Sequence, residues 1–139
     1  MPTSYLTRIV EFTAGHRIRR ADWSPEQNAR AFGKAAHEHS HHYQCRVTVK
    51  GPLHAASGGV VNLQALDHLL SEVIVKRLDG KPIHEALPEF ADGKHLATGE
   101  ALAVYVWDQL VGRLPSGVAL HAVRVQEGPN IYSEYFGEP

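Results

Sequence analysis

Two segments in the first half of the chain alternate between apolar and polar residues, which predicts strands that bury one face. The first segment is Leu6–Ile18, and the second runs over about His37–Gly51. Two more strands are predicted near the C-terminus, over Val118–Glu127 and Ile131–Phe136, on either side of a Gly-Pro-Asn turn. We therefore expect four strands, with one pair toward each end of the chain.

Between the two strand pairs the apolar residues adopt a helical spacing. Asn62 is a candidate N-cap for an amphipathic helix that extends to about Leu78, and Thr98 is a candidate N-cap for a second helix. We interpret Arg19–Lys34 and Asp79–Ala97 as loops, the first with at most a short helical turn. The order β-β-α-α-β-β predicts an α+β fold with mainly antiparallel pairing, in a single domain that spans residues 1–139.

Composition and charge exclude several classes of protein. Of the 139 residues, 43% are hydrophobic and 21% are charged, a balance typical of a globular protein rather than of a disordered chain. The formal net charge is −1 and no basic stripe is visible, so we expect no nucleic-acid partner. The longest apolar run, Ala101–Trp107, has seven residues, far fewer than a membrane span needs. The N-terminus lacks a secretory signal pattern and Cys45 is the only cysteine, so we expect a cytoplasmic location.

The chain contains ten histidines, and this number raises the question of a metal site. His39 and His41 project from the same face of the second predicted strand, and His16 can reach that face from the first strand. Three imidazoles with an open fourth position form the ligand set of a catalytic zinc site. A histidine-rich surface strand is the alternative that the pattern leaves open. His37 has the spacing to join this face, whereas His42 does not.

Several motifs follow one another along the chain: Phe12–Ile18 (FTAGHRI), His39–Tyr43 (HSHHY), Gly59–Leu63 (GVVNL), Thr98–Glu100 (TGE) and Val123–Glu127 (VRVQE). This ordered set resembles the 6-pyruvoyl tetrahydropterin synthase and 6-carboxytetrahydropterin synthase family over nearly the whole chain. The resemblance implies the tunnelling fold, in which a four-stranded antiparallel sheet carries two helices on one face. It also implies a homohexamer, built as a dimer of trimers, with active sites between subunits.

The resemblance also implies roles for particular residues. His16, His39 and His41 match the family's zinc ligands, and the zinc holds the side-chain hydroxyl oxygens of 7,8-dihydroneopterin triphosphate as a Lewis acid. Glu127 matches the glutamate that accepts N–H bonds from the pterin ring, a geometry that fixes the orientation of the ring. Thr98 matches a threonine near the pterin pocket. A solvated carboxylate at the end of a strand is the alternative for Glu127.

Two catalytic positions of the family are changed in this chain. Ala35 stands where the family has the cysteine general base of a Gly-Lys-Cys sequence. Gly80 stands where it has the histidine of a Leu-Asp-His motif, so Asp79 is a remnant of the catalytic triad. Because such groups act as a unit, we expect the usual proton relay to be lost while ligand binding is retained.

Other side chains are candidates to replace the missing base. His37 and Glu38 lie just before the second histidine motif, and His84 lies four residues after Gly80. An imidazole or a carboxylate can serve as a general base. An ordinary polar side chain without a catalytic role is the alternative for each of them. Cys45 lies within a predicted strand, and we expect its thiol to be part of the core.

Three functions remain open on these grounds. The first is a lyase-type enzyme with a substituted base that acts on a dihydropterin or a related heterocycle. The second is a non-catalytic protein that binds a pterin or a purine-like ligand. The third is a metal-binding or assembly protein without a heterocyclic ligand. Retention of the three histidines favours the first, because a pure binding protein has no need of zinc, and loss of the base favours the second.

Overall fold

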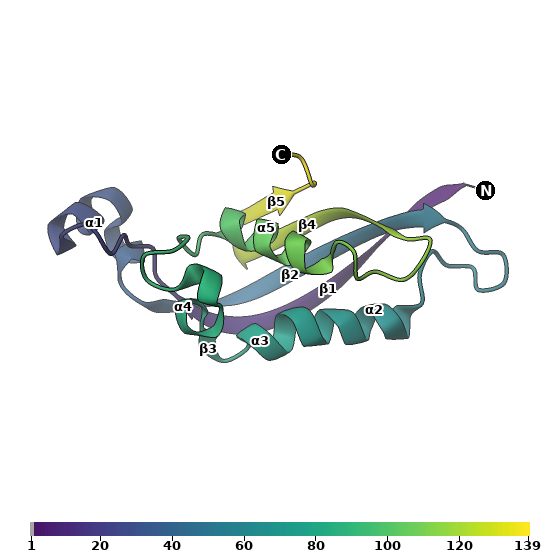
Figure 1. Ribbon diagram of the computed structural model, residues 1–139, viewed down its shortest axis with the longest axis horizontal. Helices are drawn as coiled ribbons and strands as arrows, with labels where there is room; N and C mark the ends of the chain where they lie inside the picture. Colours follow the sequence, from purple (N-terminus) through teal and green to yellow (C-terminus); the bar gives the residue numbers. More distant parts are fainter. Residues whose placement is uncertain (1) are drawn as a thin grey trace.

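A five-stranded sheet in the order β3-β1-β2-β4-β5 is the frame of the molecule, and the computed structural model describes residues 2–139 (Figure 1). The strands are β1 (Thr3–His16), β2 (His39–Pro52), β3 (Lys81–Pro82), β4 (Ala119–Gly128) and β5 (Ile131–Tyr135). Neighbouring strands pair antiparallel, except that β3 lies parallel to β1. The α+β class and the four main strands are confirmed. The two-residue β3 is an addition that the alternating pattern does not predict.

The β1–β2 ladder follows directly from the alternation in the sequence. It runs without a break from the pair of Thr3 with Pro52 to the pair of His16 with His39. The inner-face side chains of β2 are fully buried, as alternation requires of a half-buried strand: Tyr43, Cys45, Val47 and Val49. The ladder therefore sets the face on which each side chain of these two strands lies.

Two helical segments cover the inner face of the sheet. α2 (Leu63–Leu70) continues through a π-helical turn (Ser71–Val75) into α3 (Lys76–Leu78), and α5 (Gly99–Leu110) packs on β4 and β5. Both predicted N-caps are confirmed, because Asn62 and Thr98 each accept a backbone N–H bond of 3.1 Å in the first turn. Within residues 2–139, no helix has the length and apolar character needed to cross a bilayer.

The core lies between this helical layer and the inner face of the sheet. It contains large side chains from both layers: Phe12, Tyr43, Leu66, Leu70, Ile74, Leu102, Leu110 and Val123. The outer face of β1, in contrast, exposes Tyr5 and Ile9. The sheet thus has one face packed in the core and one face without a covering layer in the single chain.

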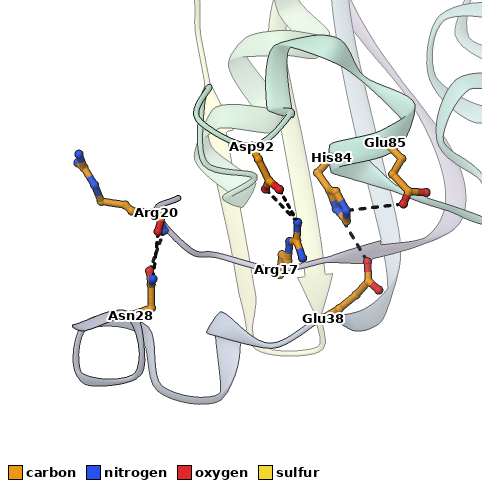
Figure 2. Close-up of polar contacts among 7 residues, drawn as sticks. All are labelled: Arg17, Arg20, Asn28, Glu38, His84, Glu85 and Asp92. Carbon is orange, nitrogen blue, oxygen red and sulfur yellow. Dashed lines mark hydrogen bonds and ion pairs between the residues drawn. The ribbon is translucent and has the colours of Figure 1, made fainter. Parts of the chain in front are cut away.

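The two predicted loops contain more structure than expected. The first folds into α1 (Pro25–Phe32) and a 3-10 turn (Gly33–Ala36), and the second contains α4 (Ile83–Ala86) and a 3-10 turn (Pro88–Phe90). Ser24 and Gln27 form a capping box at the start of α1, a local signal that the interpretation as a loop overlooks. The buried Asn28 fastens this segment, because its side-chain oxygen accepts from the Arg20 N–H at 2.7 Å (Figure 2).

Cys45 provides a test of this core. Its side chain is fully buried on the inner face of β2, and burial raises the pKa of the thiol to about 12. Because the thiolate is the reactive form, we expect the native protein at pH 8 to react with iodoacetamide at less than ~1% of the rate of the unfolded chain. Mass spectrometry with and without guanidinium chloride measures both rates. Equal rates in the two states would contradict the burial of this thiol.

Candidate metal centre

Three histidine side chains converge at one end of the sheet. His16 is the last residue of β1 and His39 is the first residue of β2, and the two are direct cross-strand partners. His41 follows two positions later on the same face. One ring nitrogen of each histidine lies within 4.8 Å of the other two, a spacing that could hold a metal ion. The structure thus brings together the three histidines that the sequence singles out, while His37 and His42 lie outside the cluster.

Hydrogen bonds to backbone carbonyls orient two of these rings. His16 is only 2% exposed, and its Nδ1 bonds to the carbonyl oxygen of Ala97 at 2.9 Å. The Nδ1 of His39 bonds to the carbonyl oxygen of His37 at 2.7 Å. Because a carbonyl oxygen only accepts, Nδ1 is the donor in both rings, and Nε2 keeps its lone pair for a metal. No sequence signal points to Ala97, since its contribution is a backbone carbonyl 81 residues away from His16.

The surroundings of the cluster favour neutral imidazoles, the form that binds metals. Burial lowers the pKa of His16 to about 4, against the opposing effect of the hydrogen bond to Ala97. Burial also lowers the pKa of His41, with a further contribution from the neighbouring His39. The Nε2 atoms of His39 and His41 approach each other to 3.0 Å. An all-imidazole donor set of this kind fits a zinc ion with an open coordination position.

A carboxylate from β4 lies beside the histidine cluster. The charge of Glu127 acts on His41 and on Tyr43, and the pKa of Tyr43 is raised first by burial and second by this carboxylate. A Cβ atom placed on Gly99 would lie 2.5 Å from the Oε1 atom of Glu127, so a side chain at position 99 would displace the carboxylate from its place at the start of α5. The positive end of that helix favours a negative charge in this position. Glu127 is therefore packed beside the metal centre and is only partly exposed.

Two further side chains adjoin this region. The hydroxyl of Thr98 accepts from the Ala101 N–H at 3.1 Å, so its contact in the structure is the cap of α5. Tyr43 is completely buried, and its ring centroid lies 6.3 Å from that of His16 and 5.7 Å from that of His41. Its hydroxyl forms no hydrogen bond within residues 2–139. The sequence could have identified Tyr43 as a neighbour of the cluster, because the alternation of side chains along β2 places it on the same face as His41.

Asp79 and Gly80 are tied to the backbone of β1. The Oδ1 atom of Asp79 accepts from the Thr13 N–H at 2.9 Å, and the Gly80 N–H donates to the Thr13 carbonyl at 2.7 Å. Asp79 thus stabilises the point where the long helical segment ends. Gly80 has a φ of 75°, in the left-handed region that other residues rarely adopt. Ala35 lies in the 3-10 turn after α1 and has no group that could accept a proton.

Glu38 and His84 face each other next to β1 (Figure 2). The Oε1 atom of Glu38 lies 3.8 Å from Nδ1 of His84, and Nε2 of His84 lies 3.9 Å from Oε1 of Glu85. A Cβ atom on Gly15 would lie 3.8 Å from the Glu38 carboxylate. Because Gly15 and its neighbour His16 project to opposite faces of the strand, Glu38 lies on the other side of β1 from the imidazole of His16.

The chain is similar to proteins of one family along almost its whole length. A sequence model of the family described as 6-pyruvoyl tetrahydropterin synthase matches residues 5–138. The chain is 39% identical to 6-pyruvoyl tetrahydrobiopterin synthase of Homo sapiens over 135 residues, which cover 96% of this chain and 91% of the human protein. It is 36% identical to the Drosophila melanogaster protein of the same name over 138 residues, covering 98% of this chain and 81% of that protein. Among solved structures, 6-pyruvoyl tetrahydropterin synthase of Caenorhabditis elegans has a TM-score of 0.90 at 26% identity, covering 99% of this chain and 98% of that chain.

The histidine cluster predicts metal binding that a matched control can test. We expect the metal-free protein to bind one Zn²⁺ per chain, and His39→Ala or His41→Ala to weaken binding at least ~100-fold, because each variant loses a donor. His42→Ala is the control, since the His42 side chain is 61% exposed and contacts Glu11 and Thr13 instead. Competition with a chromophoric chelator measures the affinities. Equal zinc affinity in the wild type and all three variants would show that the cluster does not hold the metal.

Proposed function

Because the chain belongs to the 6-pyruvoyl tetrahydropterin synthase family, we propose that it binds a dihydropterin beside a zinc ion held by His16, His39 and His41. The observation that carries this proposal is the position of Glu127 next to the same cluster, with Gly99 leaving room for the carboxylate. A carboxylate accepts two N–H bonds from a heterocycle and so fixes the orientation of the ring. The pterin ring would be anchored at Glu127, with its side chain directed toward the imidazoles. When bound, zinc would supply Lewis acidity at the hydroxyl oxygens of that side chain.

We infer that the standard synthase reaction is lost and that any activity is an altered, lyase-type reaction. Ala35 offers no proton acceptor in place of the family's cysteine. The backbone at Gly80 supports the inference, because a φ of 75° strains any other residue in that position. Asp79 is already the acceptor for the Thr13 N–H.

Glu38, supported by His84, is the substitute base that we propose. Solved variants of the Plasmodium vivax 6-pyruvoyltetrahydropterin synthase replace a catalytic glutamate by cysteine or alanine, so a glutamate has a catalytic role in that protein. The Oε1 atom of Glu38 lies 3.8 Å from Nδ1 of His84, which is beyond hydrogen-bond distance, so the two groups would have to move closer for a proton to pass between them. Because Glu38 lies on the other side of β1 from His16, it would act on a substrate held by a neighbouring subunit. His37, which is exposed, is the second candidate.

A homohexamer built from two trimers is the assembly that we propose, in the cytoplasm. Apolar side chains on two strands support an assembly of this kind, because they are about half exposed in the single chain: Tyr5 and Ile9 on β1, and Ile131 and Tyr132 on β5. Apolar residues exposed on an uncovered face of a sheet favour association with another chain. Covering these strands would place parts of several chains around each substrate.

A non-catalytic role in binding a pterin or a purine-like ligand is the second candidate function. Ala35 and Gly80 favour it, since their replacement of the family's catalytic groups leaves Glu127 and the three histidines unchanged. Such a protein would sense or carry the heterocycle instead of converting it.

Turnover of 7,8-dihydroneopterin triphosphate tests the proposed reaction. We expect the zinc-loaded protein to form 6-pyruvoyl or 6-carboxy product at no more than ~10⁻³ of the rate of the human relative, because two groups of the proton relay are replaced. Chromatography and mass spectrometry identify every product, and the human relative is assayed in parallel. Standard product at a comparable rate would overturn the inference. A hydroxymethyl pterin would indicate cleavage of the side chain, and Glu38→Gln should then abolish its formation.

The role of Glu127 has a separate test. We expect Glu127→Gln to weaken the binding of 7,8-dihydroneopterin about 10- to 100-fold, because the variant loses charge-assisted hydrogen bonds to the ring. Glu11→Gln is the control, since Glu11 is exposed and contacts Gln44 and His42 instead. Isothermal titration calorimetry measures the three affinities. Unchanged affinity in Glu127→Gln would remove the proposed anchor without affecting the metal site.

A further inference from the structure

A groove with basic side chains is lined by residues of α3, α4 and α5, and none of its lining residues belongs to the metal centre. Its volume is about 760 Å³. Cationic side chains enter it from three parts of the chain: Lys76 and Arg77 from α3, Lys81 from β3, and Arg113 from the turn after α5. The proposed function of the protein uses none of these residues.

Acidic neighbours neutralise the charge of the groove only in part. Lys76 forms an ion pair with Glu72. Arg77 and Lys81 donate only to neutral acceptors, and within residues 2–139 neither they nor Arg113 form an ion pair. The lining contains four Lys or Arg side chains and two Glu side chains, in a chain whose formal net charge is −1. Positive charge is thus concentrated in this groove.

Neighbouring residues hold Arg77 in place. Its Nη1 atom donates to the hydroxyl of Tyr105 and to Oε1 of Gln109, both at 3.2 Å and both on α5. These bonds use one of the three guanidinium nitrogens, which leaves Nε and Nη2 as a fork for an oxyanion. The π-helical turn Ser71–Val75 directly precedes α3, and such turns are frequent at functional sites. The guanidinium is therefore positioned before any ligand arrives.

An apolar pocket adjoins the basic groove. Its volume is about 370 Å³, and Phe90, Ala101 and Val104 contribute to its lining. It shares Glu89, Tyr105 and Gln109 with the basic groove, so the two hollows are neighbours. A ligand with a charged end and an apolar end would find a matching surface for each.

We propose that the basic groove binds the phosphate chain of a di- or triphosphate, with Arg77 as the fork that holds it. Arginine pairs with phosphate oxygens through two parallel N–H bonds, and lysine adds a compact charge. Lys81 supplies that charge from β3, opposite α5. The phosphate chain is the shared chemistry of free polyphosphate and of a nucleoside triphosphate, whose base would occupy the apolar pocket. This site goes beyond the proposed pterin chemistry and does not depend on it.

Calorimetric titrations with inorganic tripolyphosphate and with ATP test the proposal. They are done in about 150 mM NaCl, so that long-range attraction is screened, and are repeated after EDTA treatment, so that chelation of metal does not contribute. We expect saturable binding of one molecule per chain, weakened at least ~tenfold in Arg77→Gln and in Lys81→Gln. Tyr105→Phe, which removes one bond to the guanidinium, should show a smaller loss. Tighter binding of ATP than of tripolyphosphate would show that the apolar pocket contributes to affinity. Equal affinity would show that the protein recognises the phosphate chain alone.

Arg30→Gln is the matched control, because it removes the same charge from exposed α1. We expect this variant to bind both probes like the wild type. Absence of saturable binding, or an equal loss of affinity in Arg30→Gln, would overturn the proposal. Circular dichroism and thermal unfolding establish that each variant is folded. Glu127→Gln should leave the affinity for tripolyphosphate unchanged, which separates failure of this site from failure of the proposed pterin site.

Discussion

The pairing register of β1 with β2 decides where the proposed metal ligands lie. In this register His16 is opposite His39, and His41 projects from the same face two positions later. A slip of one residue would turn the buried side of one strand toward the outer face and separate the imidazoles. Burial of Tyr43 and its inner-face neighbours opposes the slip, since exposing one large apolar side chain costs about 1.5–3 kcal/mol. The apolar burial that stabilises the sheet is therefore also what assembles the metal ligands.

Asp79 has a structural role where the long helical segment meets the sheet. Its carboxylate accepts the Thr13 N–H, and the adjacent Gly80 N–H closes a second bond to the same residue. These contacts require an acceptor at position 79 and a left-handed backbone at position 80, which glycine supplies without strain. Both residues are thus explained by how the end of the long helical segment attaches to the sheet. The presence of Asp79 is not by itself evidence for proton transfer.

Features whose signal lies within a few consecutive residues could be predicted from the sequence. Features that depend on contacts between residues far apart in the chain could not. Alternation predicts the face that His16 occupies, and the hydroxyl of Thr98 predicts where α5 begins, because both signals lie within a few residues. β3 is a strand only because its two residues pair with the C-terminal end of β1. Two residues are too few for an alternation of apolar and polar positions to indicate a strand. The hydrogen bond of the Ala97 carbonyl to His16 could not be predicted for the same reason, because the two residues lie 81 positions apart in the sequence. The capping box at Ser24, in contrast, is visible in the sequence and identifies α1.

Three consecutive residues, Ala97 to Gly99, touch both halves of the proposed pterin site. The carbonyl of Ala97 holds the ring of His16, and the backbone of Gly99 lies against the carboxylate of Glu127. A heterocycle that shifts Glu127 would press on Gly99, and the displacement would reach His16 across two peptide units. Linkage requires any such coupling to be reciprocal, so that an occupied metal site alters heterocycle affinity by the same factor that the heterocycle alters metal affinity. The short backbone segment thus contacts a histidine of the proposed metal site at one end and the proposed heterocycle anchor at the other.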